Sequence, residues 1–208
     1  MVESQIRTNR VTDPRIVAAF ETVAREAFVG EARRGIAYVD EDLEVAPGRY
    51  LMEPMVLARL LQAALPEEGD IALDIGCATG YSTAIIAQLV QTVVGLECDR
   101  ALMDTANRTL NALDVDNAVV VEGQLEAGYA KQAPYDVILF QGAVAQVPDA
   151  VKRQLAEGGR LIAVVIDAGG IGRGTLIRRT GDSFSQRTLF DAATPLLPGF
   201  AREIGFVF

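Results

Sequence analysis

From residue 71 to residue 166 the chain alternates short apolar runs with segments of helical character. Each apolar run has the length of one buried strand, and most of the segments between runs are long enough for helices of about ten residues. Such alternation is typical of βαβ units and of a mostly parallel sheet. We expect strands at 71–75, 93–96, 118–121, 135–140 and 159–166, and helices at 81–90, 100–113 and 148–156. The sequence therefore predicts an α/β protein with a doubly wound sheet and helices on both faces.

The N-terminal section, residues 1–66, is predicted to be a helical extension. Asp13 can cap a helix, Pro14 suits its first turn, and apolar residues then recur at helical spacing. A second helix is expected to begin near Pro54. The stretch 40–48 between these helices is acidic and ends in Pro-Gly, which predicts a surface loop.

The C-terminal section, residues 167–208, is predicted to add late, partly antiparallel strands at the edge of the sheet. We expect these strands at 175–179 and 202–208, and a mobile loop at the glycine-rich stretch 169–174. The chain has 208 residues, half of them hydrophobic, which is the size of one domain. We therefore expect a single domain over 1–208.

Composition excludes several kinds of chemistry. The 28 acidic residues outnumber the 19 Lys and Arg residues, and the net charge of −9 provides no broad cationic face for nucleic acid. Because the chain has no histidine, it has no His-dependent catalytic triad, imidazole proton shuttle or His-ligated metal. Cys77 and Cys98 are too few for a disulfide framework or a four-cysteine metal site. We expect no metal and two small buried thiols.

The location of the protein is predicted from what its segments lack. The first residues are polar and mixed in charge, without the apolar core of a signal peptide. No apolar run approaches the roughly 18 residues that cross a bilayer. We therefore expect a cytoplasmic protein without a membrane partner.

A glycine turn follows the first predicted strand, with Asp74, Gly76 and Gly80 at its key positions. Glycines at such a turn let the backbone approach a nucleotide-like ligand, and the next helix presents free N–H groups. The dinucleotide fingerprint fails, because Ala78 replaces its middle glycine and Tyr81 its third. Asp74 would repel a pyrophosphate but attract the ammonium of S-adenosylmethionine, which carries no phosphate. The turn therefore predicts S-adenosylmethionine as the cofactor.

Further candidate cofactor-binding residues lie at the ends of the next strands. Glu97 closes the second strand about 20 residues after Gly76, where an acid can accept hydrogen bonds from both ribose hydroxyls. Gln124 follows the third strand, beside the expected adenine, and Gln141 ends the fourth strand at the expected switch point of the sheet. The neighbouring Cys77 and Cys98 complete the candidate set.

Purely structural roles remain open for these residues. Gly76 and Gly80 can serve tight packing of strand against helix, and residues 97–100 can form an ordinary acidic helix start. Gln124 can belong to a simple turn, and the Gln141 amide can make a structural hydrogen bond.

Several stretches of the chain occur in the order seen in protein-L-isoaspartate O-methyltransferases, and the resemblance covers most of its length. These stretches are 1–7, 23–29, 37–40, 48–54, 73–81, 134–138 and 154–161. The resemblance implies a Rossmann-like fold with its cofactor-binding core at 70–166. It also implies methyl transfer from S-adenosylmethionine to the side-chain carboxylate of L-isoaspartyl, and sometimes D-aspartyl, residues in damaged proteins or peptides. A carboxylate is already ionised at neutral pH, so this chemistry needs no strong base and suits a chain without histidine.

The chain departs from this family at the expected active site. The family loop reads Gly-Gln-Thr-Ile-Ser-Gln-Pro, and Met52 stands here in place of the serine that the resemblance makes catalytic. The catalytic residue is therefore unknown, and Glu53 adds negative charge nearby. The family's Gly-Asp-Gly motif is replaced here by Gly-Gln-Leu at 123–125. Its Thr-Ala-Ala-Ala-Pro motif is replaced by Gln-Gly-Ala-Val-Ala at 141–145. Two alternative interpretations remain open. The chain can be a methyltransferase with a different acceptor, or a non-catalytic protein that binds S-adenosylmethionine or a protein partner.

Overall fold

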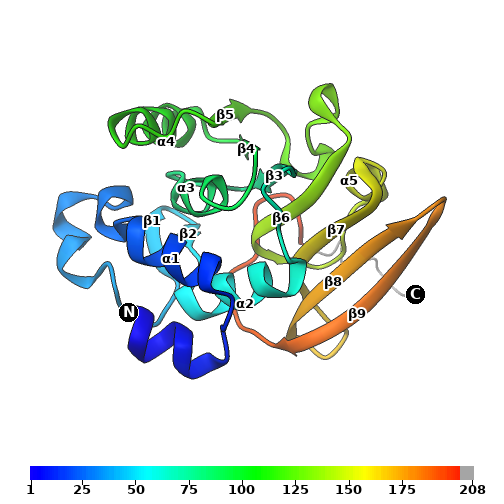
Figure 1. Cartoon of the computed structure of the whole chain (residues 1–208), viewed down its shortest axis with the longest axis horizontal. Coiled ribbons are helices and arrows are strands. Elements are labelled where there is room, and N and C mark those ends of the chain that lie inside the picture. The colour runs from blue at the N-terminus through cyan, green and yellow to red at the C-terminus, as the bar shows by residue number, and fades with distance from the viewer. Residues whose placement is uncertain (202–208) are drawn as a thin grey trace, which may run out of the picture.

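The computed structural model describes residues 1–201, and within this part of the chain the main sheet has seven strands in the order β5-β4-β3-β6-β7-β8-β9 (Figure 1). The five strands from β5 to β7 pair in parallel, whereas β8 and β9 are antiparallel. The strands are β3 (Ile71–Ile75), β4 (Thr92–Glu97), β5 (Ala118–Glu122), β6 (Tyr135–Val144), β7 (Leu155–Ile166), β8 (Gly172–Thr180) and β9 (Ser183–Asp191). The strand order reverses between β3 and β6, which is the switch point where ligands of open α/β sheets bind.

Both faces of the central parallel strands β3, β4 and β6 are buried. Successive residues of β6, such as Val137 and Ile138, alternate between two separate apolar clusters. One face is covered by the larger helices: α1 (Pro14–Thr22), α2 (Pro54–Ala64), α3 (Tyr81–Ala87) and α4 (Arg100–Ala112). The other face is covered by the short α5 (Asp149–Lys152) and by the segment that contains Leu197 and Phe200. The predicted α/β class, with a doubly wound sheet and helices on both faces, is confirmed.

Two N-terminal expectations have different outcomes. Asp13 caps α1 by accepting a hydrogen bond from the Arg15 N–H at 2.9 Å, as its position before a proline predicts. The stretch 40–48, however, is not only a loop. It contains β1 (Leu43–Ala46), which pairs with β2 (Arg49–Leu51) in a small hairpin that turns at Gly48. The two strands are too short to show a convincing alternation in the sequence.

The C-terminal expectations have different outcomes. β8 contains the predicted strand 175–179, and the predicted strand 202–208 lies outside the described residues. A further strand, β9, was not predicted. Most residues of β9 are partly or fully exposed, so the sequence lacks the apolar alternation of a half-buried strand. The predicted loop 169–174 is shorter, because β8 begins at Gly172, where a Cβ would lie 2.1 Å from the Ala192 carbonyl oxygen. The predicted helix 148–156 shrinks to α5, because β7 starts at Leu155.

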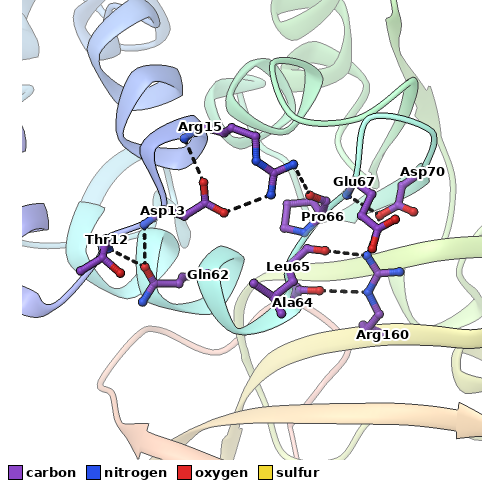
Figure 2. Close-up of polar contacts among 10 residues, drawn as sticks. All are labelled: Thr12, Asp13, Arg15, Gln62, Ala64, Leu65, Pro66, Glu67, Asp70 and Arg160. Carbon is purple, nitrogen blue, oxygen red and sulfur yellow. Dashed lines mark hydrogen bonds and ion pairs between the residues drawn. The ribbon is translucent and has the colours of Figure 1, made fainter.

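Polar contacts fix the N-terminal extension to the C-terminal part of α2 (Figure 2). The Gln62 side-chain oxygen accepts hydrogen bonds from the backbone N–H groups of Thr12 at 2.6 Å and Asp13 at 3.2 Å. Arg15 donates to the Pro66 carbonyl at 3.0 Å. These contacts set where α1 begins relative to the end of α2.

Arg160 of β7 anchors the same end of α2 to the sheet (Figure 2). Its guanidinium donates to the carbonyl oxygens of Ala64 and Leu65, both at 2.9 Å, and pairs with Asp70 at 2.6 Å. The side chains of Arg160 and Asp70 are only 13% and 10% exposed, so solvent screens this pair little. One side chain therefore satisfies the end of a helix and joins it to two parts of the sheet.

No helix among residues 1–201 is both long and apolar enough to cross a membrane.

Replacing Arg160 with Met should lower the free energy of unfolding by about 2–4 kcal/mol, because two helix carbonyls and a nearly buried carboxylate lose their partner. Urea unfolding followed by circular dichroism measures this change. Arg178→Met is the matched control, because Arg178 faces Arg160 across β7 and β8 but is exposed. Equal losses in both variants would contradict the anchoring role of Arg160.

Candidate cofactor and active site

The turn after β3 has an unusual backbone that leads directly into α3. Gly76, Ala78 and Gly80 have φ values of +77°, +50° and +93°, in the left-handed region that favours glycine. The Gly76 N–H donates to the Leu96 carbonyl at 2.8 Å, which ties the turn to the end of β4. The carboxyl ends of β3 and β4 therefore meet at one tightly folded edge of the sheet.

Glu97 lies at this edge with its side chain completely buried. One carboxylate oxygen accepts the Ala78 N–H at 2.8 Å, and the other accepts the backbone N–H groups of Cys98 at 2.8 Å and Asp99 at 3.1 Å. Asp99 also caps α4 through its own side chain. The acid predicted at the end of the second strand is thus directed into the turn that carries the glycines.

Arg49 of β2 forms a two-point ion pair with Glu97. Its Nη1 donates to one carboxylate oxygen, and its Nη2 donates to the other at 2.7 Å and to the Gly76 carbonyl at 2.9 Å. Burial lowers the pKa of the Arg49 guanidinium, but its hydrogen bonds and attraction to Glu97 outweigh burial, so the pKa lies above its ordinary value. Arg49 is therefore a permanent cation inside the candidate cofactor site.

Leu197 occupies the space directly in front of the glycine turn. A Cβ built on Gly76 would lie 2.7 Å from Cδ2 of Leu197 and 3.4 Å from Nη2 of Arg49. A Cβ built on Gly142 of β6 would lie 2.8 Å from Cγ of the same leucine. The two glycines thus form a hollow at the switch point that the chain's own leucine fills.

Asp74 is also buried, but neutral groups hold it. Its carboxylate accepts hydrogen bonds from Ser82 at 2.6 Å, Thr83 at 2.7 Å and the Gln141 amide at 2.9 Å. Burial raises the pKa of Asp74 to about 6, with a smaller contribution from Glu97, although the three hydrogen bonds oppose the rise. Asp74 thereby joins β3, α3 and β6 across the switch point.

The segment that resembles the family's catalytic loop is acidic and carries no hydroxyl at the serine position. Met52 is 2% exposed and packs in the apolar core, and its carbonyl accepts a hydrogen bond from Arg25 at 3.1 Å. Burial, together with the smaller effects of the charges on Asp40, Asp42 and Glu41, raises the pKa of the adjacent Glu53 to about 7. An anionic ligand would meet this negative charge.

The remaining candidates have mixed surroundings. Cys77 is buried as expected, but Cys98 is exposed, so the expectation of two buried thiols is wrong for Cys98. Gly80 lies against Ala106 of α4, a contact that supports its packing role. Gln124 is exposed at the start of a 3-10 turn. Among the described contacts, no hydrogen bond joins its side chain to Asp74 or Glu97.

Sequence reasoning missed Arg49 and Leu197. Arg49 lies in the stretch that resembles the family's active-site loop. The one visible signal was that an arginine stands there in place of the glutamine of the family loop. Leu197 gives no local signal, because its position depends on a return of the chain after β9. Ser82 and Thr83 had a visible signal, because both lie in the first turn of the helix that directly follows the predicted glycine turn.

The frame of this site fits the chemistry of an adenosyl group. Glu97 can accept hydroxyl donors at the end of β4, and Gly76, which has a positive φ and no side chain, lets a ligand approach the backbone of the turn. The atoms in front of the turn are the far ends of two flexible side chains, Arg49 and Leu197. The frame therefore fits the group once these two side chains move.

The sheet order, the switch point and the glycine turn define a Rossmann-like α/β fold with a candidate cofactor site at the switch point. A solved protein-L-isoaspartate O-methyltransferase has this fold, with a TM-score of 0.84 and 24% identity over 96% of this chain. This chain spans 66% of that solved chain. A Plasmodium falciparum structure described as a putative member of the same family, in complex with S-adenosyl-L-homocysteine, matches with a TM-score of 0.77 and 20% identity, covering 93% of this chain and 94% of its own.

The sequence comparisons are more specific. The family model for protein-L-isoaspartate(D-aspartate) O-methyltransferase matches residues 1–191. Protein-L-isoaspartate O-methyltransferase 1 of Rhodopseudomonas palustris (strain HaA2) is 37% identical over 79% of this chain and 67% of its own length. The Methylorubrum populi protein-L-isoaspartate O-methyltransferase is 34% identical over 96% and 94%. The chain belongs to the protein-L-isoaspartate(D-aspartate) O-methyltransferase family.

Asp74→Asn should flatten the pH dependence of stability between pH 4 and pH 7. Because the pKa of Asp74 in the folded protein is raised to about 6, the folded state holds this proton more tightly than the unfolded chain. Stability therefore falls as the pH rises from about 4 to about 6, and the wild type should lose up to about 3 kcal/mol more than the variant over this range. Urea unfolding at pH 4.5 and pH 7 measures the difference, and parallel losses would contradict it.

Proposed function

We propose that this protein transfers a methyl group from S-adenosylmethionine to the side-chain carboxylate of L-isoaspartyl, and D-aspartyl, residues in damaged proteins or peptides. The observation that carries the proposal is the family match over residues 1–191, which includes the whole glycine turn and Glu97. The curated relatives that cover most of the chain bear the name of this activity.

The cofactor site is proposed at the switch point of the sheet. Glu97 accepts the two ribose hydroxyls, and the turn at Gly76 and Gly80 provides the close backbone approach. Asp74 acts through Gln141, whose amide it orients at 2.9 Å. Cys77 and Cys98 flank the turn and Glu97, and Gln124 borders the adenine side. When bound, the sulfonium of the cofactor supplies an electrophilic methyl group.

The chain's own residues have to orient and dehydrate the acceptor. The acceptor carboxylate is ionised at neutral pH, so the missing histidine removes nothing that this reaction requires. Met52 provides an apolar wall in place of a hydroxyl. Glu53, with its pKa near 7, is partly protonated at neutral pH and in that form repels the acceptor less.

The proposal includes the setting of the reaction. The three sections, 1–66, 70–166 and 167–208, act as one domain, with the first on the acceptor side and the second holding the cofactor. The substrate is a protein or peptide, as the family match supports, and the net charge of −9 gives little affinity for nucleic acid. The setting is cytoplasmic, with which the two free thiols are compatible.

A second candidate function follows from Met52. Without the hydroxyl and with Glu53 nearby, the same fold suits a methyltransferase with a different acceptor, or a protein that binds the cofactor without catalysis. Methylation of isoaspartyl and aspartyl peptides separates these alternatives.

With saturating tritiated S-adenosylmethionine, an isoaspartyl peptide should become methylated and the same peptide with a normal aspartyl residue should not. The label is expected as a base-labile methyl ester, which is released as methanol at alkaline pH. Folded protein that binds the cofactor but labels neither peptide would favour the second candidate function. Equal labelling of both peptides would contradict isoaspartyl specificity.

The Michaelis constant for the isoaspartyl peptide should rise severalfold between pH 6 and pH 8. The raised pKa of Glu53 means that its negative charge appears within this range, whereas the acceptor carboxylate stays ionised throughout. Glu53→Gln should remove most of this rise. Glu67→Gln, an exposed acid in the turn after α2, is the charge-matched control and should keep it. A wild-type profile that Glu53→Gln leaves unchanged would contradict this role.

A further inference from the structure

Two side chains from distant parts of the chain close the candidate cofactor site. Arg49 comes from β2 and Leu197 from the segment after β9, and both lie against Gly76 at the switch point. Their side chains are almost fully buried: the Arg49 side chain is 6% exposed and Leu197 is 5% exposed. The space in front of the glycine turn is therefore part of the protein interior.

Glu97 has no acceptor capacity left in this arrangement. Its two oxygens offer about four lone-pair positions. They already accept from both Nη atoms of Arg49 and from the backbone N–H groups of Ala78, Cys98 and Asp99. The backbone donors belong to the turn and to the start of α4, so they stay in place as long as the turn is folded. Hydroxyl donors can therefore reach Glu97 only when Arg49 leaves.

Leu197 is held in place by a short segment, residues 194–200, which we call the strap. Its backbone runs beside β6, with the Ala143 N–H donating to the Pro195 carbonyl at 2.8 Å and the Leu197 N–H to the Ala143 carbonyl at 2.9 Å. Phe200 packs edge-on against Phe140, with ring centroids 5.5 Å apart. The strap thus carries Leu197 over the carboxyl edge of the sheet at a defined position.

The strap also contacts the N-terminal hairpin. The Thr194 hydroxyl donates to the Asp42 carboxylate at 3.0 Å, and the same oxygen accepts the Glu53 N–H at 3.0 Å. The segments that carry Arg49 and Leu197 are therefore joined to each other outside the site as well as inside it.

We propose that Arg49 and Leu197 form a latch that closes the cofactor site, so that the adenosyl cofactor binds only in competition with the Arg49–Glu97 ion pair and with Leu197. This inference rests on the proposed function for the identity of the ligand. A ligand that must displace an intrachain pair binds only to the open molecules. Its apparent dissociation constant is therefore the intrinsic one divided by the fraction of molecules that are open. The resting protein is closed, and weakening the latch increases its affinity for the cofactor.

Calorimetric titration with S-adenosylhomocysteine, the demethylated product of the cofactor, tests the latch without any turnover. Arg49→Gln and Leu197→Ala should each bind this probe at least tenfold more tightly than the wild type. Arg33→Gln, a half-exposed arginine that contacts Glu44 of the same hairpin, and Leu196→Ala, the exposed neighbour of Leu197, are the controls and should match the wild type.

Arg49→Gln leaves Glu97 without its cation and can fail to fold, so Leu197→Ala tests the proposal independently, with folding verified by circular dichroism. Adding Glu97→Gln to Leu197→Ala should reverse the gain, which places the probe at Glu97. Wild-type binding as tight as that of Leu197→Ala overturns the latch but leaves the proposed function standing. Folded proteins that all fail to bind overturn both.

Discussion

The central parallel strands β3, β4 and β6 are buried on both faces, and this burial constrains every polar group that they carry. Along β6, Val137, Ile138, Leu139 and Phe140 alternate between two apolar clusters, and none is exposed. A charged side chain on such a strand must find partners within the protein or lie at the end of the strand. The buried acids of β3 and β4 therefore depend on donors that the chain itself brings to the carboxyl edge.

Two neighbouring acids meet this requirement in different ways. The described hydrogen-bond donors to Asp74 are two hydroxyls and one amide, all of them neutral. Burial raises the pKa of its carboxyl. Glu97 is matched by the full positive charge of Arg49 in addition to backbone N–H groups. The first solution builds a rigid connection between β3 and β6. The second makes the state of Glu97 depend on a side chain from another part of the chain.

The sequence predicts those parts of the fold and site that depend on local patterns. The bounds of β3 and the starts of α1 and α4 follow from apolar runs and from capping by Asp13 and Asp99. The positions of the glycine turn and Glu97 follow from their spacing on this frame. Strand β9 was missed because it is mostly exposed, and Arg49 and Leu197 were missed because tertiary contacts alone bring them to Gly76. Local patterns therefore identify the frame of the site but not the side chains that fill it.

The strap has a consequence for how the chain folds. Thr194 contacts Asp42 across 152 residues of sequence, and Arg49 contacts Glu97 across 48. Contacts of such long sequence separation require large loops to close and form slowly compared with local structure. During synthesis the residues of β3 to β7 are made before Leu197. At that stage Arg49 is already present but Leu197 is not, so the glycine turn lacks one of the two side chains that cover it in the finished protein.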